Sequence, residues 1–114
     1  MTDDELVEAL KALAHPLRLR VMRALTVAER SVGQIEAAAG IGQPTLSQQL
    51  AVLRRAGLVT TRKEAKLVFY RIDETALADA VVALGGLGGT AATPDSPPAP
   101  RRSAAGVANF ARLA

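Results

Sequence analysis

Residues 31–72 constrain the possible fold more than any other part of this chain. They hold two short amphipathic helical patterns, joined by a turn that contains Gly40 and Gly42. Glycine readily takes the left-handed conformation that ends a helix, and Ser31 is a good N-cap, so this spacing predicts a helix-turn-helix. In such a unit the second helix, here about 43–56, can enter a DNA major groove, which is about 12 Å wide.

Two segments rich in β-branched residues follow this unit. They lie at 58–62 and 66–72 and predict a β-hairpin closed by Lys63, Glu64 and Ala65. Apolar stripes predict further helices at 3–14, 16–27 and about 73–84. In the second of these, Leu19, Met22 and Leu25 are expected to face inward.

The composition favours packed helices over a β-sandwich. Of 114 residues, 49% are hydrophobic but only 3% are aromatic, so the core must be built from Leu, Val, Ile and Ala. The predicted fold is mainly α with a β-hairpin wing, a winged helix-turn-helix. Residues 1–84 form the expected domain, and the Gly-, Pro- and Ala-rich residues 85–114 are expected to be a disordered tail.

Several classes of protein are not expected from this sequence. There is no cysteine, which excludes disulfides, thiolate metal sites and thiol nucleophiles. No apolar run of about 18 residues predicts a membrane span, and the acidic N-terminus does not resemble a secretory signal, so a cytoplasmic location is expected. No triad or paired carboxylates predict an enzyme, and no cofactor is indicated.

Positive charge is concentrated in one third of the chain. Residues 37–72 carry six basic residues and one acid, Glu64, for a net charge of +5, whereas residues 1–36 carry −1. Such focused charge is typical of a protein that binds a polyanion, although a solvated polar face would also carry it.

The second helix of the helix-turn-helix has two distinct faces. At about 100° per residue, Leu46, Leu50 and Leu53 share one face and are expected to pack on the core. The opposite face is polar and lacks acids, unlike an ordinary solvent-facing helix with its Glu–Lys pairs. The predicted base-reading residues are Gln43, Thr45, Ser47, Gln48 and Gln49. The predicted backbone and wing contacts to DNA are Arg54, Arg55, Arg62, Lys63 and Lys66.

Three segments together resemble the ArsR-type (arsenic-repressor-like) family of bacterial regulators. KALAHPLRLR at 11–20 is similar to the opening signature of that family, QPTLSQQLAVLRRAGLV at 43–59 to its recognition helix, and RKEAKLVFYRI at 62–72 to its wing. ERSVGQI at 29–35 and QPTLSQQ at 43–49 most resemble the branch that senses sulfide and other reactive sulfur.

This resemblance implies a homodimeric repressor that binds an inverted repeat in double-stranded DNA. The first and last helices would form the dimer interface, and their apolar stripes are consistent with it, although an intrachain core would need the same stripes. The residues implied in the interface are Leu6, Leu10, Leu13, Leu77, Val81 and Leu84.

The sensing half of the family pattern is missing. The sulfur-sensing branch uses cysteines, whereas Arg23 stands near the first of those positions and residues 83–87 near the second. Metal-sensing members use cysteines in the third helix or Asp and His in the last, so no metal site is predicted here. The inducer is therefore an unidentified signal that does not act on a thiol.

Two other functions stay open on the sequence alone. The chain could be a winged-helix module that binds protein, or a metal-responsive sensor built from carboxylates and His15. His15 precedes Pro16 at a helix junction, where a structural role is expected and a pH switch is the minor alternative.

Overall fold

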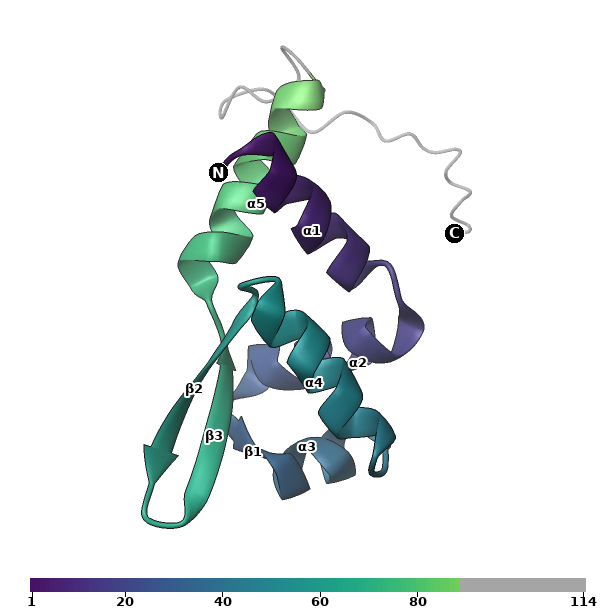
Figure 1. Ribbon diagram of the computed structural model, residues 1–114, viewed down its shortest axis with the longest axis vertical. Coiled ribbons are helices and arrows are strands. Elements are labelled where there is room, and N and C mark those ends of the chain that lie inside the picture. The colour runs from purple at the N-terminus through teal and green to yellow at the C-terminus, as the bar shows by residue number, and fades with distance from the viewer. Residues whose placement is uncertain (89–114) are drawn as a thin grey trace. The chain divides into compact units, whose positions relative to one another are not determined.

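The computed structural model describes residues 1–88 and forms the predicted order of elements, with one short strand added. Met1–Ala83 pack as one compact unit, and the last helix continues beyond it. The elements are α1 (Asp3–Leu13), α2 (Pro16–Val27), β1 (Arg30–Ser31), α3 (Val32–Ala39), α4 (Thr45–Arg55), β2 (Val59–Glu64), β3 (Leu67–Ile72) and α5 (Glu74–Leu87) (Figure 1).

Side-chain caps explain where most of the helices begin. Thr2 and Glu5 form a capping box at α1, and Ser31 and Gln34 form another at α3, so each box satisfies backbone N–H groups that the helix itself leaves free. Asp73 Oδ1 accepts a hydrogen bond of 3.0 Å from the Ala76 N–H at the start of α5. The capping role predicted for Ser31 is confirmed.

His15 caps α2. Its Nδ1 accepts a hydrogen bond of 3.1 Å from the Leu17 N–H, and Pro16 occupies the first helical position, where its missing N–H costs nothing. The structural role predicted for His15 is therefore present in the fold.

The sheet contains a strand that the sequence analysis missed. Its order is β1-β3-β2, and both pairings are antiparallel. β1 is only two residues long, too short to produce a recognisable alternation. In Figure 1 the hairpin of β2 and β3 ends in a tip that lies apart from the helices.

The hairpin turn and the end of α5 differ from the boundaries that the sequence predicted. The strands run to Glu64 and from Leu67, so only Ala65 and Lys66 lie between them, and not the three residues expected. Ala65 has a φ of 55° to close this turn. The last helix, α5, reaches Leu87, three residues beyond its expected end, because the helix continues through Gly85 and Gly86. The expected tail from residue 89 onward lies outside the described residues.

The core is aliphatic, as the composition predicted. Leu46, Leu50 and Leu53 are all at most 2% exposed, which confirms the buried face of α4. The prediction for α2 was partly wrong: Met22 and Leu25 are buried, but Leu19 is 41% exposed and Val21 is buried in its place. The other fully buried large side chains are Ile35 and Leu58. None of the helices within residues 1–88 has the length and apolar character needed to cross a membrane.

The core gives a direct test of how α4 is held. Replacing Leu53, which is 0% exposed, by Ala should lower the free energy of unfolding by about 2–5 kcal/mol because it leaves a cavity. Val27→Ala is the matched control, since Val27 is 76% exposed, and should change it by at most about 0.5 kcal/mol. Urea titrations at one protein concentration would measure both, and equal costs would contradict the assigned core.

Candidate nucleic-acid interface

The turn between α3 and α4 is set by Gly40 and by an arginine from α2. Gly40 has a φ of 69°, and a Cβ there would lie 3.2 Å from Arg20 Nη2. The same Arg20 nitrogen donates to the carbonyl of Ala39, where the cation also suits the negative end of the α3 dipole. Ile41 is buried, which fastens the turn to the core. The helix-turn-helix predicted from the sequence is therefore present.

The N-terminus of α4 is capped from outside the helix. The helix begins at Thr45, two residues later than predicted, because Pro44 occupies the cap position and offers no side-chain acceptor. Gln43 Oε1 supplies that acceptor: it receives hydrogen bonds of 3.0 Å from the Ser47 N–H and 2.6 Å from Ser47 Oγ. The first turn of α4 contains no acidic residue, so no carboxylate of the helix itself neutralises its positive dipole end.

The outward face of α4 carries most of the predicted contact residues. Ser47, Gln48 and the small Ala51 are exposed, while Thr45 is half-buried. Arg54 and Arg55 are exposed in the last turn of the helix. Hydroxyl and amide groups that can meet base edges thus precede cations that can neutralise phosphates.

One predicted base-reading residue has a different environment. Gln49 is half-buried, and its Oε1 accepts a hydrogen bond of 2.9 Å from Arg18 Nη1. Arg18 Nε also donates to the carbonyl of Ala12 in α1, at 2.6 Å. Gln49 therefore ties α4 to the first two helices, and its oxygen is already occupied.

Tyr70 is a residue at this surface that was not among the predicted site residues. It packs against the core from β3, yet it also lines a hollow of about 490 Å³ beside α4, together with Ser47, Ala51 and the two arginines of the last turn. The hollow joins the outward face of α4 to the wing. Tyr70 is 15 to 23 positions away from these α4 residues in the sequence, so no local pattern could have indicated it.

The three wing cations that were predicted to contact DNA differ from one another. Lys63 and Lys66 are exposed and form no ion pair among residues 1–88. Arg62 instead contacts two carboxylates: Nη2 lies 2.8 Å from Glu29 Oε1, and Nη1 lies 2.6 Å from Glu64 Oε1. The hydrogen bond from Arg62, together with the nearby charges of Arg62 and Arg71, lowers the pKa of Glu29 below its ordinary value.

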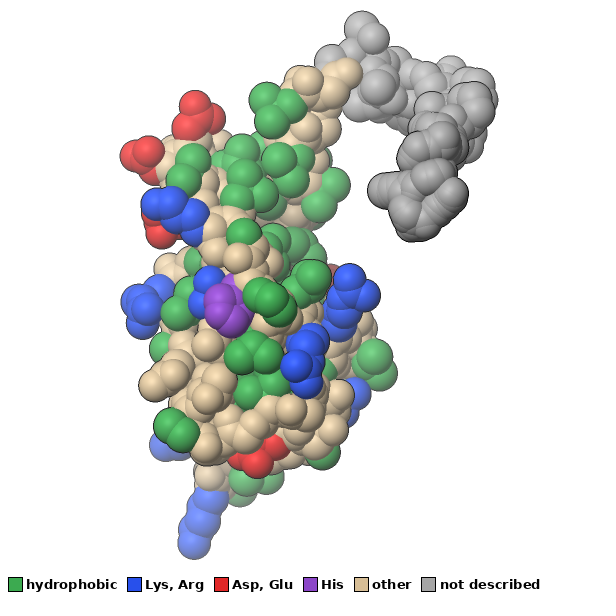
Figure 2. All heavy atoms as spheres, turned by 90° about the vertical axis from the view of Figure 1, so that its right-hand side faces the viewer, with side chains coloured by type: hydrophobic (Ala, Val, Ile, Leu, Met, Phe, Trp, Pro, Cys, Tyr) green, Lys and Arg blue, Asp and Glu red, His purple; other side chains and the backbone are tan. Residues whose placement is uncertain are grey.

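Charge is unevenly spread over the surface. Figure 2 shows one face of the molecule, on which most acidic side chains gather at one end and the Lys and Arg side chains are distributed over the remainder. The acidic first turn of α1, with Asp3, Asp4 and Glu5, lies far in sequence from the cations of α4. The hydrogen bond from the Thr2 backbone lowers the pKa of Glu5 below its ordinary value.

The residues predicted for a dimer interface fall into two groups. Leu13 and Leu77 are half-buried and pack against the core of their own chain, and Leu6 and Leu10 are also half-buried. Val81 and Leu84 on α5 are 61% and 40% exposed. Val7 on α1 and Val82 on α5, which were not among the residues predicted for the interface, are also exposed.

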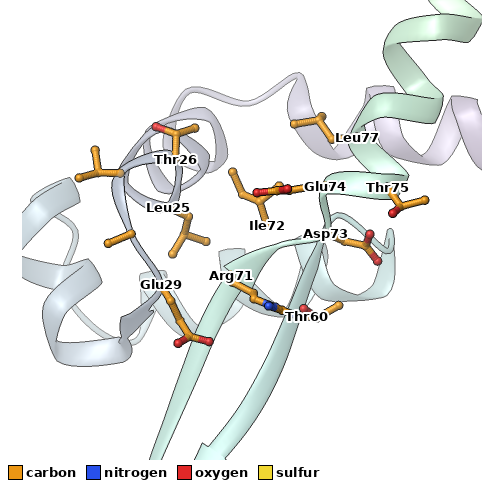
Figure 3. A pocket seen from close by; sticks show the side chains of 12 residues that line it. Leu25, Thr26, Glu29, Thr60, Arg71, Ile72, Asp73, Glu74, Thr75 and Leu77 are labelled. Atoms are coloured by element: carbon orange, nitrogen blue, oxygen red, sulfur yellow. The ribbon is translucent and has the colours of Figure 1, made fainter.

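A second hollow lies where α2, the roots of β2 and β3, and the start of α5 meet (Figure 3). Its volume is about 710 Å³, and its lining mixes Leu25, Ile72 and Leu77 with the carboxylates of Glu29 and Glu74. Within residues 1–88 no three His, Asp or Glu side chains are grouped closely enough to hold a metal ion.

Helix-turn-helix, hairpin wing and flanking helices together define a winged helix-turn-helix protein. The bacterial regulatory protein family arsR matches residues 15–61. The biofilm growth-associated repressor of Xylella fastidiosa is 51% identical over 81 residues, which are 71% of this chain and 71% of that protein. The transcriptional activator HlyU of Vibrio cholerae is 48% identical over 60% of this chain and 64% of its own length.

A solved structure agrees with these relatives. The crystal structure of the transcriptional repressor BigR from Xylella fastidiosa shares 49% identity and a TM-score of 0.61, over 74% of this chain and 86% of that one. The chain belongs to the arsR family of bacterial regulatory proteins, as the three sequence segments predicted. It is a DNA-binding transcriptional regulator and not an enzyme.

The cap of α4 can be tested apart from any DNA. Gln43→Ala removes the acceptor for Ser47 and should lower the free energy of unfolding by about 0.5–2 kcal/mol. Gln43→Glu keeps an acceptor and adds a charge that the helix dipole favours, so its stability should stay within about 0.5 kcal/mol of the parent or exceed it. Urea unfolding followed by circular dichroism measures both; two equally destabilised variants would rule out the capping role.

Proposed function

We propose that this regulator is a dimeric repressor that acts in the cytoplasm and binds an inverted-repeat operator through α4. The observation that carries the proposal is the outward face of α4, where exposed Ser47 and Gln48 are followed by Arg54 and Arg55 without an intervening acid. In a two-fold dimer the two copies of α4 would enter major grooves about one helical turn apart, or a multiple of it.

The polar groups of α4 and the cations around it would have different roles. Side chains at the first turns of the helix, with Thr45 beside Ser47 and Gln48, would read base edges. Arg54, Arg55, Lys63 and Lys66 would neutralise phosphates, which supplies affinity without sequence preference. Release from the operator would require a signal that does not act on cysteine, because the sequence contains none.

Base reading is tested by removing two side chains from α4. Ser47→Ala and Gln48→Ala should each weaken binding to the operator about 5- to 150-fold, which corresponds to about 1–3 kcal/mol per contact, while binding to random DNA changes little. Gel-shift titration of the regulator's own promoter region measures both affinities. Thr75→Ala, which removes a hydroxyl from an exposed position at the start of α5, is the control.

The outcomes separate DNA binding from the alternative of a protein-binding module. Operator affinity should fall steeply with salt, with a log–log slope of about −0.9 for each phosphate contacted. If the parent protein shows no preference for its promoter over random DNA at about 0.15 M salt, the repressor function is wrong and a protein partner becomes the better explanation.

The dimer is tested at a residue that the core does not need. Val81 is 61% exposed, so Val81→Asp should leave the fold intact but place a charge in the proposed interface. We expect the parent to sediment as a dimer, and the variant to sediment as a monomer with weaker operator binding. Val27→Asp, at a valine on α2 that is also exposed, should remain dimeric, and a monomeric parent would contradict the proposal.

A further inference from the structure

Arg62 crosses the width of the three-stranded sheet. It lies on β2, opposite Phe69 of the central strand β3, and Ser31 of β1 pairs with Phe69 from the other side. The guanidinium carbon is 4.9 Å from the centroid of the Phe69 ring, a distance typical of a cation–π contact. Arg62 thus reaches over the central strand toward the opposite edge of the sheet.

At that opposite edge the guanidinium meets Glu29. Arg62 Nε donates to Glu29 Oε2 at 2.8 Å, and Arg62 Nη2 lies 2.8 Å from Glu29 Oε1, so the pair is bidentate. Glu29 stands in the connection between α2 and β1, immediately before β1 begins. Its side chain is 26% exposed, against 49% for Arg62, so water screens this pair only in part.

This contact lies at the boundary between the anchored and the free part of the hairpin. β1 pairs with β3 only through Arg30↔Tyr70 and Ser31↔Phe69. Beyond Phe69, toward the tip, β2 is the only neighbour of β3 among the strands within residues 1–88. The tip that carries Lys63 and Lys66 is therefore a two-stranded ribbon, which by itself is marginally stable and free to twist. Arg62 ties the last supported position of this ribbon to the body of the protein.

The same contacts leave Arg62 poorly suited to bind a phosphate. Glu29 and Glu64 surround one guanidinium, so the three groups together carry a net negative charge. Hydrogen bonds to Glu29 and Glu64 raise the pKa of Arg62 above its ordinary value. A phosphate would have to displace a bidentate carboxylate that is already in place.

We propose that Arg62 is a positioning residue for the wing, which it clamps to the body of the protein through Glu29, and that Lys63 and Lys66 supply the phosphate contacts at the tip of the hairpin. The inference rests on the proposed DNA binding and revises the role first predicted for Arg62. Its consequence is that Glu29, an acid near a polyanion site, strengthens operator binding.

The direction in which Glu29→Gln changes operator affinity distinguishes the clamp from a purely electrostatic effect of the acid. If only charge mattered, removing an acid near DNA would tighten binding. If Glu29 holds the wing, Glu29→Gln should weaken operator binding about three- to tenfold, because the neutral amide replaces the carboxylate that the arginine fork requires. Glu64→Gln is the matched control: it removes an acid from the same arginine, but within the hairpin, and should not weaken binding.

Arg62→Lys provides a second test in which charge is conserved. Lysine keeps the positive charge but cannot form the bidentate fork. If Arg62 is a clamp, Arg62→Lys should lose as much operator affinity as Glu29→Gln, while the dependence of affinity on salt stays unchanged. The double variant with both substitutions should lose no more affinity than either single variant. A phosphate contact predicts near-normal binding for Arg62→Lys, and for Arg62→Gln a slope that is shallower by about 0.9.

The experiment uses the full chain and two measurements. Gel-shift titrations at several salt concentrations give affinity and slope, and hydrogen exchange of the free protein gives the protection of the β2–β3 amides. We expect faster exchange in the hairpin of Glu29→Gln and Arg62→Lys, with the rest of the domain unchanged. Tighter operator binding by Glu29→Gln, parent-like binding by Arg62→Lys, or unchanged exchange in both variants would overturn the clamp.

Failure of the clamp and failure of the proposed function give different results. If the parent protein does not prefer its promoter, the proposed function fails, and hydrogen exchange alone then decides whether Glu29 and Arg62 hold the hairpin. If the parent binds its operator and the Glu29 variant binds at least as well, only the clamp fails.

Discussion

The burial of one face of α4 is the constraint on which the rest of the molecule depends. Leu46, Leu50 and Leu53 are at most 2% exposed and pack in a single core with residues of α2 and α3. Because three leucines spaced over two turns fix the rotation of a helix about its axis, they also decide which side chains face solvent. The polar face of α4 is therefore presented by the hydrophobic core.

Hydrogen bonds and ion pairs fix the relative positions of helices and strands more narrowly than the apolar core does. Arg20 fastens the end of α3, Arg18 joins α1 and α4 through Gln49, and Arg62 joins the wing to the loop before β1. Each of these arginines donates to oxygens on other elements, where the planar guanidinium restricts geometry more than an ammonium would. Three of the basic residues of the chain thus serve to position elements, which leaves Arg54, Arg55, Lys63 and Lys66 as the cations best placed for a polyanion.

Much of the fold could be predicted from local signals. The caps at Ser31 and His15, the left-handed Gly40 and the spacing of the α4 leucines act within a few residues, so a sequence pattern records them directly. β1 could not be predicted, because two residues show no period and become a strand only when β3 lies beside them. The inward position of Val21 in place of Leu19 likewise depends on how α2 rotates against its neighbours.

The sequence by itself determined the family, the order of the elements and the outward face of the recognition helix, since these depend on period, caps and motif. Only the tertiary structure decided what individual polar side chains contact. The positions of Gln49 and Arg62 in the sequence predicted contacts to DNA. In the structure Gln49 contacts Arg18, 31 residues away, and Arg62 contacts Glu29, 33 residues away. A hydrogen bond or an ion pair across that separation has no local pattern, because it forms only when the core has already brought its elements together.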